Sequence, residues 1–470
     1  MQRRCLLQCA GGAGFALLTQ ILRQRIASGN ERVVSEAKSS GQVSAGFGRA
    51  KSVLVVIASG GQSQLETWDP RPDAPSQIRG AFGAISTAVP GTILCDRLPK
   101  LARLADRYAI VKSMSHDDLD HGSALYLALT GVYHSRLSSN PPPRETDHPF
   151  YGCVLEQQRP ATTFLRSSVI LNGPAMVPFE PGPGQYAGLL GRQYDSLIIG
   201  DIATDRPALP GLEQLDDVDA RRHLKRQRLL SELQRLRISS SSRTADMETI
   251  YQQAFGMLDR PAARQALDLN AEPAKIRDRY GRHRPGQACL LGRRLIEAGV
   301  PLVTVVWNHS NRGQDRDPDD LDQHGWDTHN DIFDVMGKSL LPRFDQSFSA
   351  LLEDMDQRGL LESTLVICMG EFGRAPLVAL ERNFAGATPG RKHWAAAYSI
   401  VFAGAGVRGG AVIGATDRHA AYPVSAKYGP WDVTATIFYA LGIDPGSHFH
   451  DSANRPYPIS SGQPIAALYE

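Results

Sequence analysis

The sequence predicts an α/β protein with a mostly parallel sheet and helices on both faces of that sheet. Ser52–Ala58 reads SVLVVIA, a continuous apolar run, and Val300–Val306 and Thr364–Met369 are runs of the same kind. Strands that are buried on both faces, as in a parallel sheet, have this composition. Segments with helical character separate the runs, and strands that alternate with helices are typical of parallel sheets.

The remaining elements continue this alternation from Phe47 onward. A Gly-rich turn at Gly60-Gly61 follows the first strand. The other predicted elements are helices at Leu98–Ala105, Ser123–Leu129 and Trp431–Leu441 and a strand at Ser399–Ala403. Because one pattern runs through the whole segment, residues 47–470 are predicted to form one domain.

The middle of the chain has a different composition. Arg221–Arg237 is a basic amphipathic segment with leucines along one side, and residues 207–279 are predicted to form a helical insertion. A membrane-surface or partner helix is one interpretation of the basic segment. The interpretation we favour is a core-packed helix with a solvated face. Asn308–Asp322 is polar and is predicted to be a mobile loop.

The N-terminal segment is predicted to be an export signal. Arg3 and Arg4 precede a weakly apolar, Gly-rich stretch that runs from Cys5 to Leu18. A twin-arginine pair before a modest apolar region is typical of such a signal. Residues 1–46 are therefore predicted to be a twin-arginine signal and linker, and the protein is expected in the periplasm or at the cell surface.

Composition and charge exclude several classes of function. The net charge is +2, so no attraction to nucleic acid is expected, and 42% hydrophobic residues suffice for a sizeable core. Outside the N-terminus no apolar run is long enough to span a bilayer. The cysteines beyond the signal have no C-x-x-C spacing, so their pairing stays open. The sequence leaves the oligomeric state open as well.

The segment from His116 to Thr130 is the richest in residues that can bind a metal ion. His116, His121 and several aspartates come directly before a helical run. Imidazole and carboxylate groups together suit a divalent ion such as zinc or manganese. The backbone N–H groups at the helix start also favour an anion, so a phosphate or sulfate ester is expected to dock there. The alternative is a polar helix start in which Asp120 or Ser123 only caps.

Two later segments offer further candidate residues. Asp327 and His329 are two residues apart, and on an extended chain such residues point the same way, so both could bind one ion. Glu371 and Arg374 follow the strand Thr364–Met369, where ligands gather in parallel sheets. Glu371 is a candidate metal ligand, and Arg374 is a candidate partner for an ester oxyanion. The alternatives are a loop that only faces water and a local salt bridge.

His393 belongs to a fourth polar segment, Gly390-Arg-Lys-His-Trp394, which precedes the strand Ser399–Ala403. A single histidine at such a place would normally be structural. It becomes a candidate metal ligand only together with the other three segments, because their joint occurrence is hard to explain as accident.

Several motifs recur in a recognisable order along the chain. They are Gly60-Gly-Gln-Ser-Gln-Leu-Glu-Thr-Trp-Asp-Pro70, Leu129-Thr-Gly-Val-Tyr133, Trp326-Asp-Thr-His329, Gly370-Glu-Phe-Gly-Arg374, Gly390-Arg-Lys-His-Trp394 and Gly414-Ala-Thr-Asp417. This order resembles the sulfatases of the alkaline phosphatase superfamily. The closer resemblance is to an uncharacterised family of twin-arginine exported, sulfatase-like proteins, domain of unknown function 1501. The resemblance covers nearly the whole chain and implies the alkaline phosphatase/sulfatase fold.

The sequence departs from the sulfatases at the positions that carry their chemistry. Counted back from Thr130, His121 stands where the resemblance places the Cys or Ser that becomes formylglycine. Ser59–Gly61 replaces the paired aspartates after the first strand, and Glu371-Phe372 replaces an Asp-His pair. A formylglycine mechanism is therefore not expected, and one ion or a different ligand set is expected.

The resemblance and the candidate residues together imply an exported metal-dependent hydrolase of phosphate or sulfate esters, acting on a small-molecule or glycan substrate. One divalent ion (zinc, manganese or calcium) would be held by some of His121, Asp327, His329, Glu371 and His393. Arg374 would stabilise the ester oxygens, and His116 or His121 would serve as general acid. The alternative is a non-catalytic exported binding or structural protein, which the lost sulfatase ligands favour.

Overall fold

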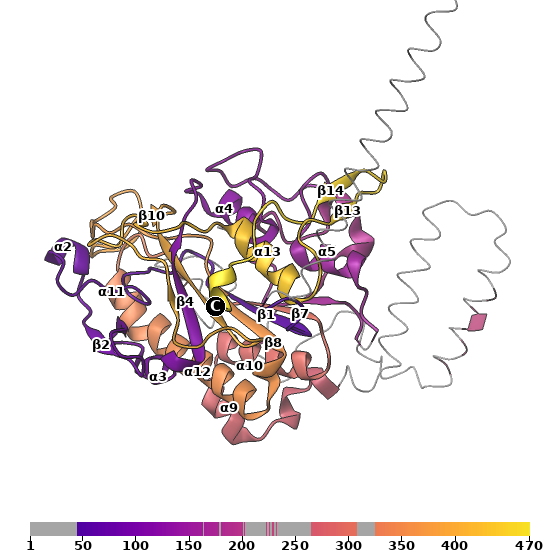
Figure 1. The fold of residues 1–470 in the computed structure, drawn as a ribbon, viewed down its shortest axis with the longest axis horizontal. Helices are drawn as coiled ribbons and strands as arrows, with labels where there is room; N and C mark the ends of the chain where they lie inside the picture. The colour runs from indigo at the N-terminus through magenta and orange to yellow at the C-terminus, as the bar shows by residue number, and fades with distance from the viewer. Residues whose placement is uncertain are drawn as a thin grey trace, which may run out of the picture. The chain divides into compact units, whose positions relative to one another are not determined.

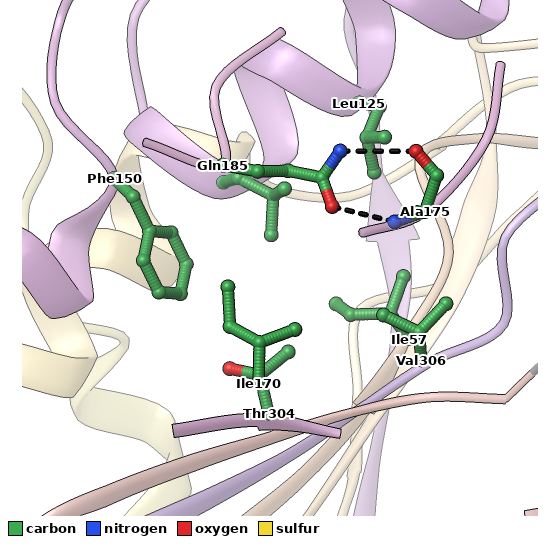
Figure 2. Close-up of a pocket in the computed structure, with 9 residues that line it drawn as sticks. Ile57, Leu125, Phe150, Ile170, Ala175, Gln185, Thr304 and Val306 are labelled. Atoms are coloured by element: carbon green, nitrogen blue, oxygen red, sulfur yellow. Dashed lines mark hydrogen bonds between the residues drawn. The ribbon is translucent and has the colours of Figure 1, made fainter. Parts of the chain in front are cut away.

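A mostly parallel sheet lies at the centre of the described part of the chain (Figure 1). Its strand order is β12-β4-β11-β8-β1-β7-β5-β6. The strands are β1 (Ser52–Ile57), β4 (Tyr108–Met114), β5 (Ser168–Leu171), β6 (Leu197–Ile199), β7 (Leu302–Val306), β8 (Thr364–Met369), β11 (Tyr398–Ala403) and β12 (Val412–Ile413). Strand β11 runs antiparallel to both of its neighbours, and the other pairings are parallel. The predicted fold class is confirmed.

Helices pack on both faces of this sheet (Figure 1). One face carries α3 (Pro99–Arg103), α9 (Ala274–Tyr280), α10 (Arg284–Glu297) and α12 (Leu341–Gln357), and the other carries α4 (His121–Thr130), α5 (Tyr151–Gln158) and α13 (Pro430–Ala440). Side chains of β1 alternate between the two cores: Leu54 and Val56 face the first, and Val53 and Val55 face the second. Burial on both faces explains why this strand is apolar throughout.

Shorter elements surround the sheet. They are the helices α2 (Ser76–Arg79) and α11 (Ile332–Val335), a π-helical turn at Met336–Leu340 that joins α11 to α12, and the paired strands β2 (Ala84–Ser86) with β3 (Ile93–Cys95), β9 (Gly373–Arg374) with β10 (His393–Trp394), and β13 (His448–His450) with β14 (Pro456–Pro458). In the pair β9–β10, the candidate residues His393 and Arg374 are directly opposite each other.

The structure describes residues 45–200, 202, 265–307 and 325–470, apart from residues 163, 178 and 179, together with residues 222, 225, 228, 229 and 232. Gly46–Glu470 form one compact unit. The predicted export signal, the loop at Asn308–Asp322 and most of the predicted insertion lie outside these residues. None of the described helices combines the length and the apolarity that crossing a membrane would require.

The sheet brings the candidate segments to one edge. Strands β1, β4, β7 and β8 run in the same direction, so their carboxyl ends lie together. Gly60 follows β1, His116 follows β4, and Glu371 follows β8. Ligand sites in parallel sheets form at this edge, which is why residues so far apart in sequence can meet.

Candidate metal centre

Three side chains converge at the carboxyl edge of the sheet. His121, Asp327 and His393 each bring a ligand atom within 4.8 Å of the other two. Asp327 Oδ1 lies 3.2 Å from His121 Nε2 and 3.3 Å from His393 Nε2. Ligands at about 2.0–2.1 Å from a tetrahedral zinc ion are about 3.3 Å apart, so this spacing fits such an ion.

His329 adjoins this group. Its Nε2 lies 3.2 Å from Asp327 Oδ1 and 2.9 Å from His393 Nε2. It therefore contacts two of the three converging groups, although the set that meets mutually within 4.8 Å is His121, Asp327 and His393. Asp327 and His329 reach the same point, as side chains two residues apart on an extended segment do.

A buried nitrogen supports the fit to a metal ion. His121 Nε2 lies near Asp327 Oδ1, yet within the described part of the chain it makes no hydrogen bond of acceptable geometry. Buried polar atoms in proteins are nearly always bonded. A cation between the imidazole and the carboxylate would satisfy both atoms, so the residues present fit a divalent ion.

Hydrogen bonds at Nδ1 orient the rings of His121 and His393. His121 Nδ1 donates a hydrogen bond to Glu371 Oε1 at 2.7 Å, and His393 Nδ1 donates to the Leu119 carbonyl at 2.6 Å. Metal-binding histidines are usually held in this way, because the outer hydrogen bond leaves Nε2 with its lone pair facing the ion. The Gly60 N–H also donates to Glu371 Oε1, at 2.7 Å. Glu371 was expected to be a ligand, but the structure places it on the far side of His121.

Arg374 does not face open space. Its side chain is fully buried and donates to the carbonyls of Gly60, Gly61 and Arg391 and to Asp327 Oδ1, the last at 2.6 Å. The guanidinium thus holds the Asp327 carboxylate in place and joins the turn after β1 to the segment Asp327–His329. Four of its five N–H donors are bonded in this way, and the side chain has no exposed surface, so it does not face an ester oxyanion as the sequence predicted.

The start of α4 is also engaged. The backbone N–H of His121 donates to Asp120 Oδ1, that of Gly122 donates to Asn140 Oδ1, and that of Ser123 donates to the Ser139 carbonyl. These are the groups that the sequence predicted would bind an anion. The alternative that Asp120 caps the helix is the arrangement found.

His116 lies beside the site but does not face it. Its Nε2 donates to the Glu371 carbonyl at 2.7 Å, and its Nδ1 accepts from the Asp118 N–H at 3.1 Å. Burial lowers the pKa of this imidazole below its usual value. A neutral ring with both nitrogens bonded to the backbone serves to fix the Glu371 loop, which is a geometry that does not favour a general acid.

Charge is concentrated at the convergence point. Burial alone would lower the pKa of His121, but Asp327 and Glu371 outweigh it and raise that pKa to about 9. Burial and the charge of His121 lower the pKa of His393 to about 3. Burial would raise the pKa of Asp327, but His121 and Arg374 hold it well below its usual value. The carboxylates therefore favour positive charge at this point, which a cation would also supply.

Several residues that shape the site carried no signal in the sequence. Phe372 lies against His121 and His393, with ring centroids 5.0 and 4.6 Å apart, and Phe384 stacks on His329 at 3.8 Å. Leu119 contributes only its carbonyl. A backbone atom or an apolar ring has no characteristic spacing, so only the fold shows these contacts.

Comparison with known proteins gives the following matches. A family model described as "Protein of unknown function (DUF1501)" matches residues 50–469. No curated protein sequence matches the chain. Similar solved structures include a phosphonate monoester hydrolase from Silicibacter pomeroyi, with 12% identity, a TM-score of 0.39 and coverage of 89% of this chain and 76% of that chain.

Two further solved structures are similar at the same level. A sulfatase from Pseudoalteromonas sp. has 14% identity and a TM-score of 0.37, with coverage of 84% of this chain and 68% of that chain. A mutant of TAB5 alkaline phosphatase with bound magnesium has 12% identity and a TM-score of 0.36, with coverage of 78% and 94%. At such low identity and TM-scores, none of these likenesses assigns a function to this chain.

Proposed function

This chain belongs to the family described as "Protein of unknown function (DUF1501)", and from that premise we propose that it is a metal-dependent hydrolase of phosphate or sulfate esters. The observation that carries the proposal is the convergence of His121 Nε2 and His393 Nε2 on Asp327 Oδ1. Catalytic zinc sites use three such protein ligands and leave a position open for water or substrate.

The donor set favours zinc over the other candidate ions. Calcium prefers oxygen ligands throughout, whereas imidazole nitrogens suit zinc and, less strongly, manganese. His121, Asp327 and His393 would hold the ion, and His329 is the neighbouring candidate. When bound, the ion would polarise the ester or activate a water molecule. Because His121 stands in place of the formylglycine precursor, the reaction is not of the formylglycine type.

Three further groups hold the proposed ligands in position. Glu371 fixes the ring of His121, the Leu119 carbonyl fixes that of His393, and Arg374 fixes Asp327. The proposed substrate is a small-molecule or glycan ester. The proposal includes export by the twin-arginine signal at Arg3 and Arg4 to the periplasm or cell surface.

Elemental analysis of protein purified without chelator tests the proposal, together with hydrolysis of a broad panel of phosphate and sulfate esters. We expect near-stoichiometric zinc and activity against at least one ester class. His121→Ala should lose both, and His448→Ala, at an exposed histidine on β13, should lose neither. Full zinc occupancy in His121→Ala would overturn the ligand assignment.

A non-catalytic binding or structural protein is the second candidate. The burial of Arg374 and the capped start of α4 favour it. Both elements were expected to bind the ester, but Arg374 is fully buried with four of its five donors bonded, and the first N–H groups of α4 are bonded within the protein. Stoichiometric zinc with no turnover on any ester would support this second candidate and overturn the hydrolase.

A further inference from the structure

Asn330 directly follows His329, and its side chain faces a turn at residues 381–385. Its side chain is fully buried. Its Nδ2 lies 2.9, 3.1 and 3.1 Å from the carbonyls of Glu381, Phe384 and Ala385, and its Oδ1 accepts from the Glu381 N–H at 2.8 Å. Both the NH2 group and the oxygen of this amide bond the same turn, and among the other side chains only the longer glutamine carries the same donors and acceptor.

The turn places a phenyl ring on a histidine of the site. Phe384 stacks on His329 with ring centroids 3.8 Å apart and an angle of 6° between the planes. Phe384 as a residue is 42% exposed, so it is not part of the hydrophobic core. His329 Nδ1 has no hydrogen-bond partner within the described residues, unlike Nδ1 of His121 and of His393. Nε2 of His329 contacts Asp327 and His393, and the stacked phenyl ring supports the imidazole, whose Nδ1 has no hydrogen bond of its own among the described residues.

Asp331 fastens the adjoining part of the same loop. Its N–H donates to the Thr388 carbonyl at 2.9 Å, and its Oδ1 accepts from the N–H groups of Ala387 and Thr388 at 3.0 and 2.6 Å. The backbone of Asp331 has a φ of 53°, which is uncommon for a residue with a Cβ. Two consecutive side chains, Asn330 and Asp331, thus bind the segment 381–388 to the residues that follow His329.

We propose that Asn330 and Phe384 are positioning residues of the metal centre: Asn330 fixes the turn, and through it Phe384 fixes the ring of His329. The inference rests on the metal centre of the proposed function. Without this support the His329 ring can rotate away from Asp327 and His393. Residues that orient metal-binding histidines typically change metal affinity by about 10- to 100-fold when they are replaced.

Zinc affinity measured by competition with a chromophoric chelator tests the inference. Asn330→Ala and Phe384→Leu should each weaken zinc binding about 10-fold or more, while Phe384→Tyr, which keeps the flat ring, should restore it. The absorption spectrum of the cobalt-substituted protein should change in the first two variants, because it reports the arrangement of ligands. Phe47→Leu, at a phenylalanine that is 37% exposed and packs on Tyr439, is the matched control and should change nothing.

A second measurement separates this inference from the proposed function. In the metal-free protein, the NMR signals of the His329 ring carry the shift caused by the stacked phenyl ring. They should move in Phe384→Leu and in Asn330→Ala. If the wild type takes up no zinc and these signals still move, the metal centre fails but the positioning of His329 stands.

Two results would overturn the positioning role. One is unchanged zinc affinity and an unchanged cobalt spectrum in both Asn330→Ala and Phe384→Leu, which would leave the proposed function intact. The other is a lower free energy of unfolding of the metal-free variants together with wild-type zinc affinity, which is the result expected if the loop contacts only stabilise the fold.

Discussion

Arg374 Nη2 lies 2.6 Å from Asp327 Oδ1, the oxygen on which the histidines of the site converge. The same guanidinium donates to the carbonyls of the turn after β1 and to that of Arg391. The buried guanidinium of Arg374 therefore links Asp327 to two loops, the turn after β1 and the segment that contains Arg391.

Replacing this cation should destabilise the fold. Arg374→Met keeps the aliphatic stem but leaves Asp327 and several carbonyls without a partner in the interior. Breaking a buried pair costs about 3–5 kcal/mol, which urea unfolding in the presence of chelator would measure. The matched control is Arg107→Met in the exposed Arg107–Asp356 pair, which should cost less than about 1 kcal/mol. Equal small losses would show that Asp327 tolerates the loss of its partner.

Glu371 should affect metal affinity without being a ligand. Glu371→Gln preserves the shape of the side chain but weakens the hydrogen bond to His121 Nδ1. Because outer-shell partners of this kind tune affinity, zinc binding should fall by about 10-fold, while full occupancy is still reached at higher zinc. The exposed Glu362→Gln is the control. Loss of zinc at every concentration would instead make Glu371 a direct ligand.

Gly61→Ala should destabilise the fold more than Gly91→Ala, because only at Gly61 would the added Cβ clash with a neighbour. The φ of Gly61 is +82°, and an added Cβ would lie 2.6 Å from the ring of Phe372, which packs against His121. Gly91 has a φ of +81° and nothing within 4 Å of such a Cβ. Gly91→Ala should therefore cost only the backbone strain, about 1–2 kcal/mol.

The clash at Gly61 should add about 1–3 kcal/mol to that strain. Chemical unfolding of the two alanine variants side by side measures the difference directly. If both variants lose the same stability, the Phe372 ring moves aside freely, and the close packing around His121 is not rigid.

His148 should make the fold less stable in acid. Burial lowers its pKa to about 4, whereas in an unfolded chain the pKa is about 6.5. As the pH falls below 6.5 the unfolded chain takes up a proton that the folded chain does not, so stability present above pH 6.5 is lost toward pH 4. At pH 5 the loss is roughly 2 kcal/mol relative to pH 7.

The variant His148→Asn cannot titrate, so its unfolding free energy should fall less between pH 7 and pH 5 than that of the wild type. Urea unfolding at the two pH values measures the difference, with His450→Asn at an exposed histidine as control. A wild-type pH dependence in His148→Asn would assign the acid sensitivity to other groups.

The sequence predicted the central strands well because burial on both faces leaves a plain apolar run. Thr364–Met369 is β8 without any shift of its ends. Strand β4 was missed because Lys112 interrupts its run, and only the fold shows that this lysine pairs with the buried Asp69 at 2.9 Å. The antiparallel direction of β11 also has no local signature, since apolar composition is the same in either direction.

The types of residue at the site were predictable, but their roles depended on the fold. The cluster of histidines and aspartates before a helix pointed to His121, the two-residue spacing to His329 pointed to Asp327, and the position after a strand pointed to Glu371. Whether a carboxylate faces an ion or the histidine behind it depends on side-chain torsion angles that no sequence spacing encodes. Glu371 and Arg374 both turn out to hold other side chains.

His121, Asp327 and His393 come from three distant parts of the chain. Synthesis proceeds from the N-terminus, so a ribosome-bound chain that has exposed His121 and Asp327 still lacks the hairpin strand that carries His393. The three side chains can meet only after most of the polypeptide has emerged and the sheet has assembled. In the proposed zinc enzyme, loading with the ion would therefore come late, once the sheet has brought the three segments together.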